Sequence, residues 1–178
     1  MPDPARIAHP LRRRIRIAAA LACLAASGAR ADESPVVAAI EAAYLTKFPA
    51  FVDWPPGAPA ALCVLASDSV GRLIDQAESK LPADADPAVV RRLRTDSPAA
   101  DCRILFIGDP NQGLADRSPA TAILVVTDQA SEGRKGVINF VIRDDRVRFE
   151  IDDAEAARRG LVISSKLLSL AVAVKPRA

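Results

Sequence analysis

Residues 102–107 read CRILFI, a run of six side chains of which one is charged. Residues 61–66 (ALCVLA) and 122–126 (AILVV) have the same apolar character. Such short runs are typical of strands that a parallel sheet buries on both faces. Between residues 66 and 102 the sequence also contains a helical stretch near Val70–Glu78 and an extended segment at Ala88–Leu93. This alternation of strands and helices predicts an α/β fold, with a largely parallel sheet and flanking helices.

A helix is predicted before the first strand, because apolar side chains recur at helical spacing after Ser34-Pro35. Pro49 interrupts this pattern, since a proline disfavours the α conformation in the residue before it. We therefore expect the helix to kink or end near Lys47–Phe48, and a turn to follow through Trp54–Gly57. The apolar stripe consists of Val37, Ile40, Tyr44, Phe48 and Phe51.

The C-terminal part has a different pattern. Val137–Arg143 and Arg146–Ile151 are joined at Asp144-Asp145, and the second segment alternates between apolar and polar side chains, which predicts an antiparallel hairpin. A short helix is expected at Asp152–Arg159, closed by Gly160 in a left-handed C-cap. A terminal helix is expected to start at Ser164 or Ser165 as N-cap. Its apolar positions are Leu167, Leu170, Ala171 and Val174, while in the hairpin Val147, Phe149 and Ile151 oppose Arg146, Arg148 and Glu150.

The N-terminus has the features of an export signal. Four arginines lie between residues 12 and 16, the apolar run Ile17–Ala26 follows, and Ala29-Arg30-Ala31 resembles a cleavage site. The run is about half as long as a membrane-spanning helix requires. We therefore predict a signal peptide at residues 1–31 and a single periplasmic domain at residues 32–178. An alternative is a lipoprotein box ending at Cys23, but Ala20 stands where a branched aliphatic residue is usual.

Cleavage after Ala31 changes the charge of the chain. Residues 1–31 contain six arginines and one aspartate, so the 24 basic and 22 acidic side chains fall to 18 and 21, and the formal net charge changes from +2 to −3. This acidic balance argues against nucleic acid as a partner. The only histidine, His9, is removed as well. The mature domain therefore lacks the side chain most used for proton transfer and for zinc, and we expect no catalytic site, no metal and no cofactor.

Cys63 and Cys102 are the only cysteines of the predicted mature domain, and each lies on a predicted strand. An even number of cysteines in an oxidising compartment favours a disulfide. The alternative is two buried free thiols.

Three further groups invite a chemical interpretation. Ser164-Ser165-Lys166 lacks the Ser-x-x-Lys spacing of a nucleophile pair, since Ile163 occupies the first position, and helix capping is preferred. Tyr44 and Trp54 are interpreted as packing residues rather than a ligand cage. Five acidic residues could form a calcium site, but they lack the spacing of an EF-hand. We interpret them as acidic residues of a turn and of a helix N-terminus. They are Asp144, Asp145, Asp152, Asp153 and Glu155.

Several motifs resemble those of the YfiR-like periplasmic proteins, in the same order and over nearly all the mature chain. The most specific stretch runs from VRFEI (residues 147–151) to ISSKLL (residues 163–168). The other motifs are AYLTKF (43–48), FVDWP (51–55), LCVL (62–65), Asp101-Cys102, LFI (105–107) and INF (138–140).

This resemblance implies a repressor that binds the periplasmic domain of an inner-membrane diguanylate cyclase and thereby lowers cyclic-di-GMP and biofilm formation. It also implies a homodimer, an outer-membrane lipoprotein that can sequester the repressor, and dependence on disulfides. Cys63 and Cys102 fit one such bridge, and the hairpin has no cysteine for a second.

The resemblance also directs attention to the hairpin and the helix after it as the partner-binding surface. We hypothesise that Ile138, Phe149, Glu150 and Ala156 form this surface. Two alternatives stay open. One is a periplasmic sensor of a small ligand, bound at the carboxyl ends of the parallel strands. The other is an exported hydrolase, for which the sequence offers no recognisable site.

Overall fold

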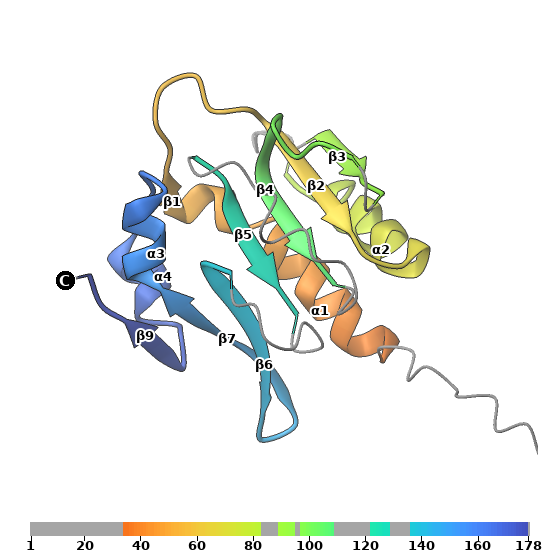
Figure 1. The fold of residues 1–178 in the computed structure, drawn as a ribbon. Helices are drawn as coiled ribbons and strands as arrows, with labels where there is room; N and C mark the ends of the chain where they lie inside the picture. Colours follow the sequence, from red (N-terminus) through yellow and green to blue (C-terminus); the bar gives the residue numbers. More distant parts are fainter. Residues whose placement is uncertain (1–33, 83–88, 95–96, 109–121, 129–135, 178) are drawn as a thin grey trace, which may run out of the picture. The chain divides into compact units, whose positions relative to one another are not determined.

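The apolar runs of the sequence form the centre of a seven-stranded sheet in a computed structural model of the chain (Figure 1). The model describes residues 34–82, 89–94, 97–108, 122–128 and 136–177, so the predicted signal peptide lies outside the described residues. Neighbouring strands follow the order β3-β2-β4-β5-β6-β7-β9, and the pairs from β3 to β6 are parallel. Their bounds are Ala61–Leu65 (β2), Val89–Arg92 (β3), Cys102–Ile107 (β4), Leu124–Thr127 (β5) and Ile138–Arg143 (β6).

The predicted hairpin is confirmed. Strand β7 (Arg146–Asp152) pairs antiparallel with β6, and the register joins Arg143 to Arg146 across a two-residue turn. Asp144 and Asp145 both adopt positive φ, at 50° and 56°. Two successive residues with positive φ are the signature of the turn type whose twist suits a tight hairpin. Asp-Asp therefore closes this hairpin where Asn-Gly is more usual.

Two helices cover one face of the sheet. Helix α1 (Pro35–Leu45) passes across this face and contacts both β7 and helix α2 (Asp68–Glu78) (Figure 1). As predicted, the helix ends before Pro49, and a 3-10 turn, η1 (Phe48–Phe51), follows it. Four aromatic rings join α1 and η1 to the hairpin at centroid separations of 5.5–6.0 Å. These rings belong to Tyr44, Phe48, Phe140 and Phe149, so Tyr44 is a packing residue.

The opposite face of the sheet is buried as well, because alternate side chains of the same strands enter a second cluster. Cys63 of β2 and Cys102 of β4 lie in this cluster, both with no exposed surface. They are joined by a disulfide with a Cα–Cα distance of 5.6 Å, in agreement with the predicted pairing. The bridge ties the neighbouring strands β2 and β4 together on the side of the sheet away from α1.

Two short strands form a second sheet that the sequence analysis did not predict. Strand β1 (Val52–Asp53) pairs antiparallel with β8 (Val162–Ile163). Between β7 and β8 lies α3 (Asp153–Arg158), and Gly160 follows it with φ of 73°, as predicted. The N–H groups of Gly160 and Leu161 donate to the carbonyls of Ala157 and Ala156, which closes the helix.

The predicted terminal helix is partly wrong. Helix α4 spans only Ser165–Leu168, and the chain then forms strand β9 (Ala173–Lys175), which pairs parallel with β7. The N–H of Val172 donates to the carbonyl of Phe149 at 2.9 Å. The free edge of β7 offers backbone groups that need partners, and this requirement outweighs the helical spacing of Leu170 and Val174.

Replacing both cysteines, in a Cys63→Ala, Cys102→Ala variant, should destabilise the domain. The bridge closes a loop with a sequence separation of 39 residues, and the chain-entropy model gives a loss of about 4 kcal/mol for a loop of this length. Urea denaturation of the purified domain measures the change in the free energy of unfolding. A reducing agent should destabilise the wild type and leave the variant unchanged. An unchanged urea midpoint in the variant would show that the bridge contributes nothing.

Candidate partner-binding site

Three of the four residues predicted to bind a partner lie in the interior. Ile138 and Ala156 have no exposed surface, and Phe149 is 2% exposed. Their side chains support the sheet and helix α3 from within and do not reach the surface of this chain. Glu150 is the one of the four whose side chain faces outward, because it follows Phe149 on β7 and successive side chains of a strand point to opposite faces.

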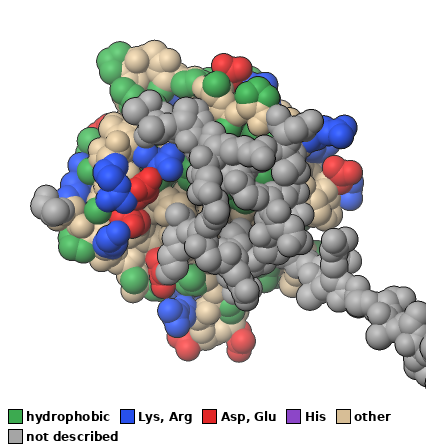
Figure 2. Space-filling model, viewed as in Figure 1, with side chains coloured by type: hydrophobic (Ala, Val, Ile, Leu, Met, Phe, Trp, Pro, Cys, Tyr) green, Lys and Arg blue, Asp and Glu red, His purple; other side chains and the backbone are tan. Residues whose placement is uncertain are grey.

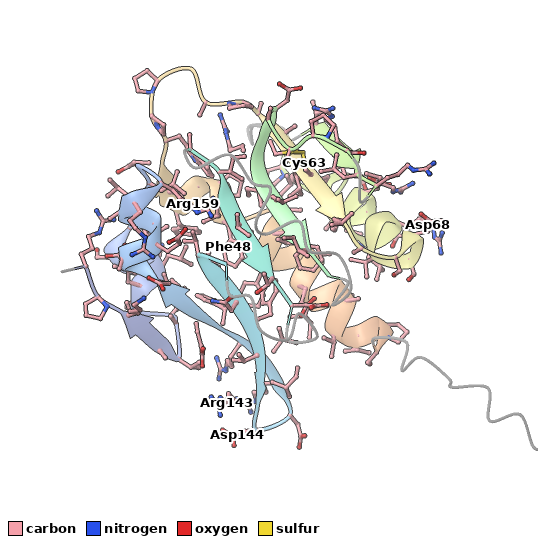
Figure 3. The ribbon with its side chains drawn as sticks, in the orientation of Figure 1. Phe48, Cys63, Asp68, Arg143, Asp144 and Arg159 are labelled. Atoms are coloured by element: carbon pink, nitrogen blue, oxygen red, sulfur yellow. A yellow bond between two sulfur atoms is a disulfide. The ribbon has the colours of Figure 1, made fainter. Side chains whose placement is uncertain are left out.

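Glu150 lies between the hairpin and the last strand of the sheet. Its Oε1 accepts a hydrogen bond at 3.4 Å from Nη2 of Arg143, the last residue of the neighbouring strand β6. On the other side it stands in register with Ala173 of β9. Arg143 lies beside Asp144 at the projecting end of the hairpin, far from Phe48 in the core (Figure 3). We define the β7–β9 surface as Arg143, Arg148, Glu150, Ala173 and Lys175.

Ion pairs fasten the C-terminal segment to the start of helix α3. The Asp152 carboxylate caps the helix by accepting from the N–H of Glu155 at 2.7 Å, and it also accepts from Nζ of Lys175 at 2.9 Å. Asp153 accepts two hydrogen bonds from Arg177, at 2.7 and 2.9 Å. Arg177 donates further to the carbonyl of Leu161 at 3.1 Å. We call Asp152, Asp153, Lys175 and Arg177 the C-terminal latch.

These contacts shift the ionisation of the groups involved. Burial opposes ionisation of Asp152, but hydrogen bonds from Lys175 and from the Glu155 N–H lower its pKa below the ordinary value of 3.8. Burial likewise opposes ionisation of Glu155, and hydrogen bonds from Arg158 and Arg159 lower its pKa below 4.5. The hydrogen bond to Asp153 raises the pKa of Arg177. The carboxylates of Asp152 and Glu155 are thus stabilised in their charged form.

Exposed apolar side chains lie on the same C-terminal segment as these charges. Leu170 is 56% exposed, Val172 45% and Val174 39%. Figure 2 shows acidic and basic side chains interleaved over α3 and β9, with further charges at the hairpin tip. Apolar side chains bordered by charged ones are a common composition for a surface that binds another protein.

The sequence analysis missed the latch and strand β9. The signals were present, because residues 171–174 (AVAV) alternate and include two β-branched side chains. Lys175 and Arg177 then provide the two cations that meet Asp152 and Asp153. A helix was predicted instead, because Leu167, Leu170 and Val174 also recur at helical spacing.

The remaining candidates have structural roles in the described part of the chain. Ser164 is the N-cap of α4, where its Oγ accepts from the N–H of Leu167 at 3.3 Å. The Lys166 ammonium lies 5.6 Å from the ring centre of Phe51. Trp54 packs at the edge, with the Arg103 guanidinium 5.4 Å from its ring centre. The capping and packing interpretations are therefore confirmed.

The five acids considered for calcium are divided between two places. Asp144 and Asp145 form the hairpin turn, whereas the other three lie at α3 and are engaged by basic side chains. Among the residues that the structure describes, no group of three or more potential ligands is arranged to hold a metal ion. Within the same residues, no helix is long and apolar enough to cross a membrane.

The crevice that a small ligand would need borders segments outside the described residues. Residues 109–121 and 129–135 follow the carboxyl ends of β4 and β5 and are not described. The small-ligand alternative therefore stays a prediction.

The structure is a disulfide-linked α/β domain with charged and exposed apolar side chains side by side at the β7–β9 edge of its sheet. The family model described as YfiR/HmsC-like matches residues 38–172, and the chain belongs to this family. The matched range includes Cys63, Cys102 and Glu150, and it ends before β9 and the basic half of the latch. Comparison with curated proteins gives no match.

Acid should weaken the domain through Asp152 and Glu155. Their folded-state pKa values are depressed, so their stabilising contribution is complete above the ordinary values of 3.8 and 4.5 and is lost as the pH falls below them. Asp152→Asn keeps a capping oxygen but loses the charge. Acidification from neutral pH to below about pH 4 should lower the urea midpoint of both proteins. We expect the decrease to be smaller in Asp152→Asn than in the wild type. Asp144→Asn, at the hairpin tip, is the control. Identical losses in the wild type and Asp152→Asn would contradict this assignment.

Proposed function

We propose that this protein is a periplasmic regulator that binds the periplasmic sensor domain of an inner-membrane diguanylate cyclase and holds the enzyme inactive. The observation that carries the proposal is the family match over residues 38–172, which includes every strand from β2 to β7. Repression lowers cyclic-di-GMP and biofilm formation. An outer-membrane lipoprotein that sequesters the regulator relieves the repression.

The regulator acts by differential binding. It can silence the cyclase only by binding the inactive conformation of the sensor domain more tightly than the active one. A preference of about 5.5 kcal/mol moves an equilibrium from almost entirely active to almost entirely inactive. This mechanism requires a preformed surface and no catalytic group.

The β7–β9 surface supplies the contact in this proposal. Glu150 and Arg143 present charges held by the antiparallel hairpin, and the apolar side chains of the C-terminal segment lie next to them. Phe149 precedes Glu150 on β7, points to the opposite face of the sheet and packs against Tyr44 and Phe48. The buried residues Ile138, Phe149 and Ala156 thus act as the rigid support of the surface, and Glu150 acts in the contact.

Glu150→Lys should abolish repression of the cyclase while the melting temperature stays close to that of the wild type. The substitution breaks an ion pair whose arginine is 62% exposed and whose Glu150 side chain is 18% exposed. A pair with one solvated partner contributes about 1 kcal/mol or less to stability. Cyclic-di-GMP in cells that contain the cyclase, and thermal unfolding of the purified variant, are the two measurements. Asp101→Lys is the control for a charge reversal elsewhere, because Asp101 forms an ion pair with Arg91 at 3.2 Å near β4 and is 78% exposed, compared with 18% for Glu150.

A charge exchange separates docking from local structure. If Glu150 serves only to hold Arg143, the double variant Arg143→Glu, Glu150→Arg restores the pair and with it repression. If Glu150 contacts the cyclase, the double variant still fails to repress the enzyme. Full repression by Glu150→Lys, or unfolding of that variant, would count against this surface.

A further inference from the structure

A groove runs along the outer side of helix α1. Its volume is about 570 Å³, and small-molecule sites typically enclose about 300–1,000 Å³. Tyr44 and Lys47 line one end of the groove, and apolar side chains line the rest. The apolar lining consists of Pro35, Val36, Ala39, Ile40 and Ala43.

The shape of the groove follows from the helical repeat. Val36, Ile40 and Tyr44 are spaced by four residues and form a raised row along the helix. Ala39 and Ala43 lie beside this row, and their single methyl groups leave a trough. Val36 is 67% exposed and Ile40 is 39% exposed, so the trough opens at the surface.

The polarity of α1 is the reverse of that in an ordinary surface helix. Its one charged residue, Glu41, is 1% exposed and lies on the inner side with Ala38, Ala42 and Leu45. A helix without a polar face is typically covered on all sides. The sheet covers the inner side, so the apolar trough on the outer side is suited to a ligand rather than to water.

The polar groups of the groove gather at one end. The Lys47 side chain is exposed, and it forms no ion pair with any other residue in the described part of the chain. Tyr44 precedes it by three residues, so the two side chains lie on the same side of the chain. An ammonium and a phenol both donate hydrogen bonds to a carboxylate. The groove therefore complements a ligand with a long apolar part and an anion at one end.

The length of the helix matches a single acyl chain. Helix α1 has 11 residues, which corresponds to about 16 Å. One acyl chain spans half the hydrocarbon core of a bilayer, about 15 Å. A protein partner is a poorer match, because a stable protein–protein interface takes about 20–30 residues from each side and this groove has seven lining residues.

We propose that the groove on α1 binds a free fatty acid. The hydrocarbon chain lies in the trough beside Val36 and Ile40, and the carboxylate meets Lys47 and the Tyr44 hydroxyl group. The inference does not depend on the proposed function.

Calorimetric titration of the purified chain with dodecanoate, below its micelle-forming concentration, tests the site. One equivalent should bind, and decanoate should bind up to about tenfold more weakly because it buries two fewer methylene groups. Ala39→Glu should weaken dodecanoate binding by about tenfold or more, since it places a carboxylate in the trough. Val36→Ser is the second variant in case Ala39→Glu does not fold. Val89→Glu is the control, because Val89 is 64% exposed on β3.

A second pair of ligands tests the role of Lys47. Lys47→Met should raise the dissociation constant of dodecanoate about two- to fivefold, as expected for loss of an exposed ion pair. It should leave the dissociation constant of dodecanol unchanged, whereas a merely structural role of Lys47 would alter both. Lys80→Met is the control, because Lys80 is exposed just after α2.

Three results would overturn the proposal. The first is a wild type that does not bind dodecanoate, or one that binds it no more tightly than Ala39→Glu and Val36→Ser do. The second is sedimentation with phosphatidylglycerol vesicles without dodecanoate binding, which would assign the groove to a membrane surface. The third is loss of cyclase repression or of self-association in Ala39→Glu when the wild type binds no dodecanoate, which would assign the groove to a protein.

Discussion

The packing of Tyr44 and Phe48 against Phe149 of the hairpin determines the layout of the molecule. The rings lie at 5.5 Å in edge-to-face geometry, a separation and orientation that aromatic pairs favour. This contact holds the inner side of α1 on the sheet, and the outer side is left at the surface. It also fixes the orientation of β7, so that Glu150 points away from α1.

Much of the fold could be predicted because its signals are local. Strands β2 and β4 have apolar side chains at successive positions. This pattern is typical of strands in a sheet that is covered on both faces. The hairpin is indicated by the alternation of residues 146–151 and by the turn at Asp144-Asp145, two residues of a type that tolerates positive φ better than most. Gly160 ends α3 for the same conformational reason.

The remaining features depend on contacts between distant segments. Strands β1 and β8 have two residues each, too few for any periodicity, and they exist because Val52 meets Ile163 across the chain. Strand β9 is selected by the free edge of β7 rather than by its own sequence. The burial of Ile138 and Ala156 was not predicted for a related reason. A family motif identifies positions, but it does not show whether the side chain at a position binds a partner or packs in the core.

Strand β9 is the part of the β7–β9 surface with the least intrinsic stability. Its three residues are all exposed, so little apolar burial holds them in place. The latch adds ion pairs through Lys175, whose side chain is 63% exposed, and Arg177, at 38%. The cations of these pairs are solvated, which keeps the contribution of each pair to about 1 kcal/mol, although the Asp152 and Asp153 side chains are only 21% and 10% exposed. Segments of this kind open with small free energies, and a partner that binds only their folded form stabilises them. If the β7–β9 surface is where the proposed partner docks, docking and ordering of β9 would be coupled, and the edge of the sheet would adjust while the disulfide holds β2 and β4 together.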